Sequence, residues 1–167
     1  MPLMTCKVIR KKRNLDQLRE GIVRIGWFSD VRYDDNLPVA YVARWQEFGT
    51  PNAKYPIPAR PFMRPAIHGS QVVLQEKLQM LYRTALQNNT NTMVALATFG
   101  EMVLERIQTQ IDATMTPPNS PITLYGGWLR SKRGIPFHVN PKRGSHPLID
   151  TGFMRDTIRY ETEEIKK

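Results

Sequence analysis

The chain has 167 residues, of which 41% are hydrophobic and 23% charged, a balance typical of one globular domain spanning 1–167. Its single cysteine, Cys6, excludes an internal disulfide, and its three histidines lack the closely spaced Cys or His partners of a zinc site. No apolar run approaches the roughly 20 residues that cross a bilayer. We therefore expect an intracellular protein with no membrane segment, no metal and no cofactor.

The formal charge of +9 is concentrated in two segments that flank a nearly neutral remainder. Neither segment contains an acidic residue; residues 1–15 carry Lys7, Arg10, Lys11, Lys12 and Arg13, and residues 117–149 carry Arg130, Lys132, Arg133, Lys142 and Arg143. This pattern suggests an acidic partner, either nucleic acid or an acidic protein surface. Basic segments that only keep a protein soluble would give the same pattern.

The first elements in the chain are predicted to be strands. Residues 6–10 and 22–28 have strand character, and Val23, Ile25 and Trp27 give the second segment a period of two. A short helix follows between Asn36 and Gly49. Pro38 suits its first position, and Gly49 suits its end.

Residues 50–66 contain prolines at positions 51, 56, 58, 61 and 65, which disfavour both a helix and a central strand. We predict an extended, proline-rich strap over the rest of the fold. Two helices are predicted after it, from Ser70 to about Gln87 and from Thr92 to Ala113. Apolar residues at helical spacing carry both predictions: Val73, Leu74, Leu78 and Leu81 in the first, and Leu96, Phe99, Val103, Ile107 and Ile111 in the second.

The stretch 114–148 is rich in Pro, Gly, Ser and basic residues and has little periodicity, which predicts an extended basic loop. We expect 117–147 to be mobile in a free subunit and ordered between subunits. Residues 157–161 are a predicted closing strand, and 162–167 a flexible tail. The predicted fold class is α+β, with a small antiparallel sheet packed against two or three helices.

Asp150-Thr151-Gly152 matches the D-T-G signature of aspartic proteases, in which two aspartates share one proton. Too few residues follow Gly152 to build the rest of such an enzyme, so capping of the next turn by Asp150 or Thr151 is favoured. Ser145 and His146 lie near Asp150 in the sequence, but sequence proximity in a loop does not position a triad. We expect no catalytic residue.

Several motifs in a fixed order carry a family resemblance: YVARWQEFG at 41–49, IPARPFMRPA at 57–66, PPNSPITL at 117–124 and PLIDTGFMRDTIRYE at 147–161. Together they resemble the tail-completion or neck proteins of tailed bacteriophages. The resemblance implies a structural virion protein, assembled in the host cytoplasm, that forms a ring of six copies. Its implied neighbours are a head-side connector or adaptor, the tail tube or tail terminator, and genomic DNA in the channel.

The resemblance also implies roles for individual residues. Trp45, Phe48 and Phe62 would pack the strap against the helices, within a structural motif that also includes Gly49, Pro58, Pro61, Asp150, Thr151 and Gly152. Arg60 and Arg64 would meet a carboxylate such as Glu47, at a subunit boundary or at the edge of the core. Packing within the domain is the alternative for these residues. The interface would include Glu47, Arg60, Arg64, Arg130, Lys132, Arg133, Lys142 and Arg143.

A different class of function is also open. The second basic segment interleaves its charges with Tyr125, Trp128 and Phe137, which is typical of proteins that grip phosphates and stack on bases. The rival prediction is therefore a nucleic-acid-binding module. Salt-dependent DNA binding by the isolated monomer would favour it.

Overall fold

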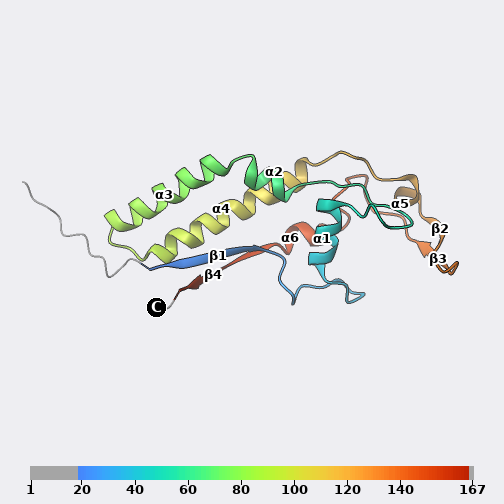
Figure 1. Ribbon diagram of the computed structural model, residues 1–167, viewed down its shortest axis with the longest axis horizontal. Helices are drawn as coiled ribbons and strands as arrows, with labels where there is room; N and C mark the ends of the chain where they lie inside the picture. The colour runs from blue at the N-terminus through green and yellow to red at the C-terminus, as the bar shows by residue number, and fades with distance from the viewer. Residues whose placement is uncertain (1–18, 166–167) are drawn as a thin grey trace, which may run out of the picture.

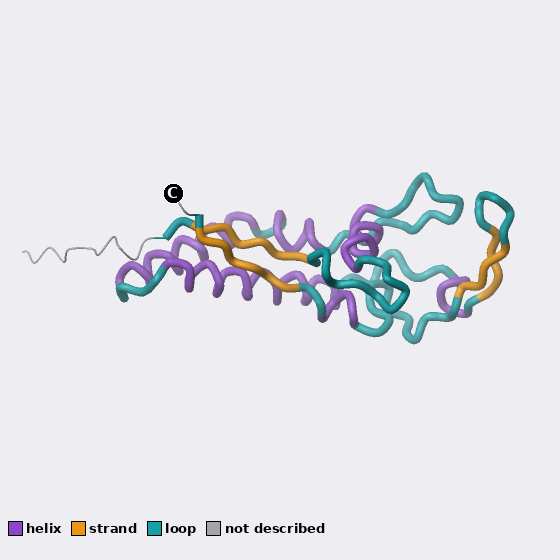
Figure 2. Tube along the Cα trace, turned by 90° about the horizontal axis from the view of Figure 1, so that it is seen from below, coloured by secondary structure: helices purple, strands orange, loops and turns teal. Residues whose placement is uncertain are grey.

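Helix α4, Thr92–Ala113, is the spine of the computed structural model, which describes residues 19–165. Helix α3, Gln71–Gln87, packs along one side of α4, and a two-stranded sheet packs along the other, as Figure 1 shows. The molecule is elongated, with this helical body at one end and a small β-hairpin at the other (Figure 2). The predicted α+β class is confirmed.

The bounds of α4 are those predicted from its apolar stripe. Leu96, Val103, Ile107 and Ile111 are buried, as the stripe requires, and the last two are fully enclosed. The helix begins after Asn91, whose side-chain oxygen accepts the N–H of Met93 as an N-cap. The stripe therefore serves the hydrophobic core.

The sheet beside α4 joins the two ends of the described chain. Strand β1, Gly21–Gly26, pairs antiparallel with β4, Arg159–Glu164, so that Gly21 lies opposite Glu164. The prediction of a flexible tail over 162–167 is wrong for its first three residues, since Thr162, Glu163 and Glu164 belong to β4. The predicted strand at 6–10 and the basic segment 1–15 lie outside the described residues.

Helix α3 follows the prediction, but its apolar side is only partly covered. Leu74 and Ala85 are buried against the body, whereas Val73 is exposed although it was expected on the packed face. The helix ends at Gln87 with Asn88 as its C-cap, and Asn89 adopts a positive φ of 56° in the connection to α4.

Helix α1, Val39–Phe48, is the predicted short helix, and Pro38 directly precedes it. Gly49 ends the helix with φ 72°, and a Cβ there would lie 2.7 Å from the main-chain oxygen of Ile57. Only glycine fits this passage into the strap. The strap is shorter than predicted, because helix α2, Met63–His68, accommodates Pro65 in its first turn, where a proline removes no intrahelical hydrogen bond.

The stretch 114–148 is not a structureless loop, which corrects the prediction. It contains helix α5, Pro121–Tyr125, and a hairpin of β2, Gly127–Arg130, with β3, Pro136–Val139. A last short helix, α6, Phe153–Asp156, leads into β4. Among residues 19–165, no helix combines the length and apolar character needed to cross a bilayer.

Candidate functional site

The first two motifs that carry the family resemblance meet around Glu47, which is buried at the end of α1. One carboxylate oxygen accepts the main-chain N–H groups of Phe62 at 2.7 Å and Met63 at 2.9 Å. The other accepts the N–H of Arg64 at 3.2 Å and its Nε at 2.8 Å. Glu47 thereby supplies acceptors to the otherwise unpaired N–H groups at the start of α2.

The ionisation of Glu47 is set by two opposing effects. Burial by itself would raise its pKa, but the Arg64 side chain and the three main-chain N–H groups outweigh burial and hold the pKa below its usual range. The predicted contact between Arg64 and Glu47 is therefore formed, and it is formed within one chain.

Arg60 lies inside the fold, with 4% of its surface exposed, and not at a surface as expected for an interface residue. Its Nε and Nη2 donate to the main-chain oxygens of Pro117 at 2.7 Å and Pro118 at 2.9 Å, and its Nη1 donates to Oε1 of Gln46 at 2.9 Å. Burial lowers the pKa of Arg60. The guanidinium ties the strap to α1 and to the segment after α4.

The aromatic residues of the first two motifs differ in their surroundings. Phe62 is fully buried and meets the edge of Trp27 at a ring-centroid distance of 5.8 Å, as its predicted packing role requires. Phe48 is 58% exposed and lies under the guanidinium of Arg64, and Trp45 is exposed and stacks on Tyr41. Trp45 and Phe48 are therefore more exposed than the predicted role of packing the strap against the helices requires. Pro58 and Pro61 are exposed on the strap.

The D-T-G segment has a local structural role. Asp150 is exposed and accepts the main-chain N–H of Arg143 at 2.8 Å, and Thr151 accepts the N–H of Phe153 at 3.3 Å. Gly152 has φ 86°, in the left-handed region that favours glycine. Thr151 thus caps the next backbone turn as predicted, whereas Asp150 instead fixes the preceding loop at Arg143.

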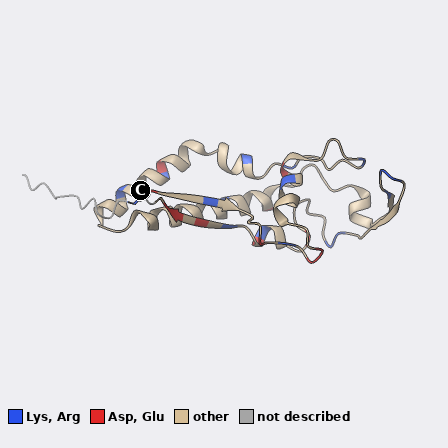
Figure 3. Ribbon diagram, turned by 60° about the horizontal axis from the view of Figure 1, so that its bottom comes forward, with Lys and Arg blue, Asp and Glu red and all other residues tan. Residues whose placement is uncertain are grey.

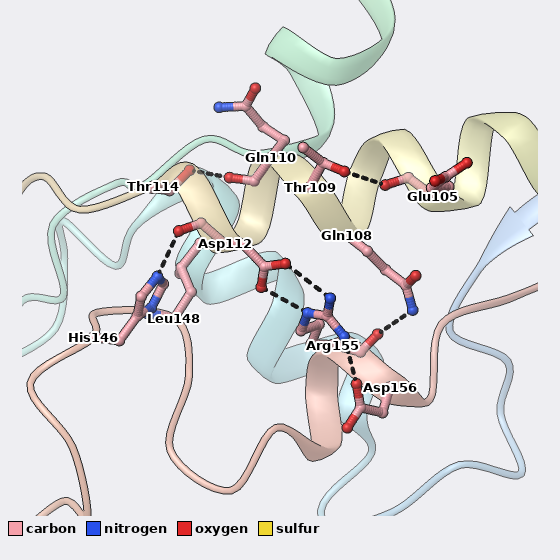
Figure 4. A network of polar contacts seen from close by, with 10 residues as sticks. All are labelled: Glu105, Gln108, Thr109, Gln110, Asp112, Thr114, His146, Leu148, Arg155 and Asp156. Carbon is pink, nitrogen blue, oxygen red and sulfur yellow. Dashed lines mark hydrogen bonds and ion pairs between the residues drawn. The ribbon is translucent and has the colours of Figure 1, made fainter.

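His146 does not contact Ser145 or Asp150 through its imidazole. Its Nδ1 accepts the N–H of Leu148 at 3.2 Å, and its Nε2 donates to the main-chain oxygen of Asp112 at 3.0 Å, as Figure 4 shows. The carboxylate of Asp112 is held by Arg155 at 2.6 and 2.8 Å, which lowers the pKa of Asp112. These contacts fasten the last motif to the end of α4.

The predicted interface cations of the second basic segment are not equivalent. Lys142 is half-buried, and its Nζ donates to the main-chain oxygens of His146 at 2.7 Å and Pro147 at 2.9 Å. Burial lowers the pKa of Lys142. Lys142 therefore has a structural role, whereas the remaining four are exposed: Arg130, Lys132, Arg133 and Arg143.

The strap and the hairpin enclose a groove of about 940 Å³ between them and the D-T-G segment. Ile57, Leu129 and Phe137 are among its apolar lining residues. Tyr55 from the strap meets Phe137 from β3 at a centroid distance of 6.5 Å, and Lys132 reaches the main-chain oxygen of Asn52. The contact between strap and hairpin was not predicted, because the hairpin was not.

Residues 19–165 contain no cluster of His, Cys, Asp or Glu that could hold a metal ion. Comparison of the chain with protein family models, with curated proteins and with solved structures finds no match. The phage-neck resemblance thus rests on the sequence motifs alone.

Proposed function

We propose that this chain is a structural subunit of the neck of a tailed bacteriophage, where a ring of six copies completes the tail or joins it to the head-side connector. One observation carries the proposal: the resembling segments, distant in sequence, form one unit. Glu47 holds 62–64 and Arg60 holds 117–118. Trp27, which lies outside the motifs, packs on Phe62 and donates from Nε1 to the main-chain oxygen of Met154 at 2.7 Å, so it links the last motif to the others. Motifs that serve one structural role are expected to contact one another in the folded chain in this way.

The elongated shape and the exposed apolar residues support assembly into a ring. Val72 and Met80 of α3 are 67% and 61% exposed, while Tyr41 and Phe48 of α1 are 53% and 58% exposed. Two different apolar surfaces on one subunit suit head-to-tail contacts, which close into a ring when the rotation between neighbours allows it. The neighbours proposed for the ring are the connector or adaptor and the tail tube or terminator.

The ring is tested by native mass spectrometry and electron microscopy of the purified chain, and by reconstruction of the virion neck. We expect a closed ring on the head–tail axis. Changing Val72 and Met80 together to Glu should abolish the ring while circular dichroism of the subunit is unchanged. The matched control adds the same two charges on the exposed face of α4, where Thr98 and Thr109 are changed to Glu. A virion with this chain as an isolated copy away from the axis would contradict the proposal.

A further inference from the structure

The strap, helix α5 and the hairpin contain no acidic residue, although Asp150 lines the groove that the strap and the hairpin enclose. Neither 48–75 nor 113–149 contains Asp or Glu. Figure 3 shows basic residues on the hairpin end without acidic ones beside them. Within residues 19–165, the following exposed cations of this end form no ion pair: Lys54, Arg130, Lys132, Arg133 and Arg143. These side chains therefore carry positive charge that no ion pair within residues 19–165 neutralises, and such a surface attracts a polyanion.

The hairpin presents these charges on a defined ribbon. Leu129 and Phe137 are cross-strand partners on the side that lines the groove. On the other face, Trp128 lies opposite His138, with ring centroids 5.2 Å apart, and 71% of Trp128 is exposed. Arg130 follows two positions later on the same face.

The turn of the hairpin fixes two cations at its tip. Ser131 N–H donates to the oxygen of Ile135 at 2.8 Å, and Gly134 N–H donates to that of Ser131 at 3.0 Å. Gly134 has φ 81°, which allows the tight turn. Lys132 and Arg133 lie between these bonds and are exposed. Their positions are thus set by the main chain.

We propose that the β2–β3 hairpin binds duplex DNA without sequence preference. The major groove of B-form DNA admits a two-stranded β-ribbon, whereas that of duplex RNA is too deep and narrow for side chains to enter. In this arrangement Lys132 and Arg133 contact phosphates, and the Trp128 face lies against the groove. The inference goes beyond the proposed ring, because each subunit carries the complete hairpin.

The test measures fluorescence anisotropy of a short labelled DNA duplex titrated with the full chain at several salt concentrations. Each phosphate contact contributes about 0.9 to the slope of log affinity against log salt. Changing Lys132 and Arg133 to Gln should lower that slope by about 1.8 and weaken binding more than about tenfold near 0.1 M salt. The matched control, Lys77 and Arg83 of α3 changed to Gln, removes equal charge from the helical body and should leave the slope nearly unchanged.

The basic segment 1–15 also carries charge, so the comparison is repeated with Lys11, Lys12 and Arg13 changed to Gln. The hairpin's contribution to the slope should persist in that background. A second readout is the fluorescence of Trp128, one of three tryptophans: duplex DNA should change the emission of the wild type more than that of Trp128→Phe.

Several results would overturn the proposal. They are absence of salt-dependent binding by the wild type, equal binding by the hairpin variant and the α3 control, and equal or tighter binding to single-stranded DNA or duplex RNA. Binding to an acidic protein such as polyglutamate but not to DNA would assign the surface to a protein partner instead. A monomeric chain that binds duplex DNA through the hairpin would refute the ring and leave this inference standing.

Discussion

Arg64 binds Glu47 through two hydrogen bonds, from Nε to the Glu47 carboxylate at 2.8 Å and from Nη2 to the Glu47 main-chain oxygen at 2.9 Å. The same carboxylate accepts the N–H groups that begin α2. The end of one helix and the start of another are thus joined through one side chain. Because the strap runs between them, this contact also fixes where the strap returns to the body.

Replacing Glu47 with Gln should lower the free energy of unfolding by about 3 kcal/mol, since an amide cannot accept all four N–H groups and leaves buried donors unpaired. Urea denaturation followed by circular dichroism measures the change. Glu101→Gln on the exposed face of α4 is the control and should move stability by less than about 0.5 kcal/mol. Equal effects of the two substitutions would contradict the role given to Glu47.

Acid should weaken the fold partly through Glu47. Its folded-state pKa is lowered, so its contribution to stability is present above the usual glutamate pKa of about 4.3 and is lost as pH falls through the folded value. As the pH is lowered below about 4.3, the urea concentration at the unfolding midpoint should therefore decrease in the wild type. It should decrease less in Glu47→Gln. The exposed Asp34→Asn variant should follow the wild type. Parallel curves for all three proteins would rule out the linkage.

Lys142 should matter to folding and Arg143 should not. Lys142→Met leaves the main-chain oxygens of His146 and Pro147 without this donor, which should lower the free energy of unfolding by about 1–3 kcal/mol. Arg143→Gln, on the next, exposed residue, should change it by less than about 0.5 kcal/mol. Thermal denaturation of both variants compares them. If Lys142→Met is as stable as the wild type, Lys142 does not have the structural role given to it here.

Gly100 marks the closest approach of α4 to the sheet. A Cβ there would lie 2.7 Å from the Tyr160 ring and 2.9 Å from Val23 Cγ2. Gly100→Ala should therefore destabilise the protein by about 1 kcal/mol or more, because overpacking outweighs the roughly 1 kcal/mol gain in helix propensity. Gly144→Ala, where the added methyl group meets no atom within 4 Å, is the control. If Gly100→Ala stabilises the protein, Tyr160 and Val23 can move aside for the added methyl group, and the packing there is not tight.

The helices were predictable because their packing is regular. The stripe on α4 repeats at helical spacing over the whole element, and Gly49 and Asn88-Asn89 mark breaks that local chemistry requires. Helix α2 was missed because prolines dominate its surroundings, although Pro65 occupies a first turn where proline is tolerated.

The candidate site was less predictable, because its parts depend on contacts distant in sequence. Arg60 is buried against Pro117 and Pro118, and nothing local in the strap indicates that its charge faces main-chain oxygens. The hairpin did leave a signal, since Ile135, Phe137 and Val139 alternate with Pro136 and His138 directly after Gly134. Each strand is too short for periodicity to stand out against the basic residues.

The pairing of β1 with β4 has a consequence for how the protein is made. Arg24 and Glu163, which form an ion pair across these strands, are 139 positions apart. During synthesis β1 leaves the ribosome while its partner is still untranslated, and closing so long a loop carries an entropic cost. The α3 and α4 pair makes contacts that are closer in sequence, so we expect it to form before the sheet and to provide the surface against which β1 and β4 then pair.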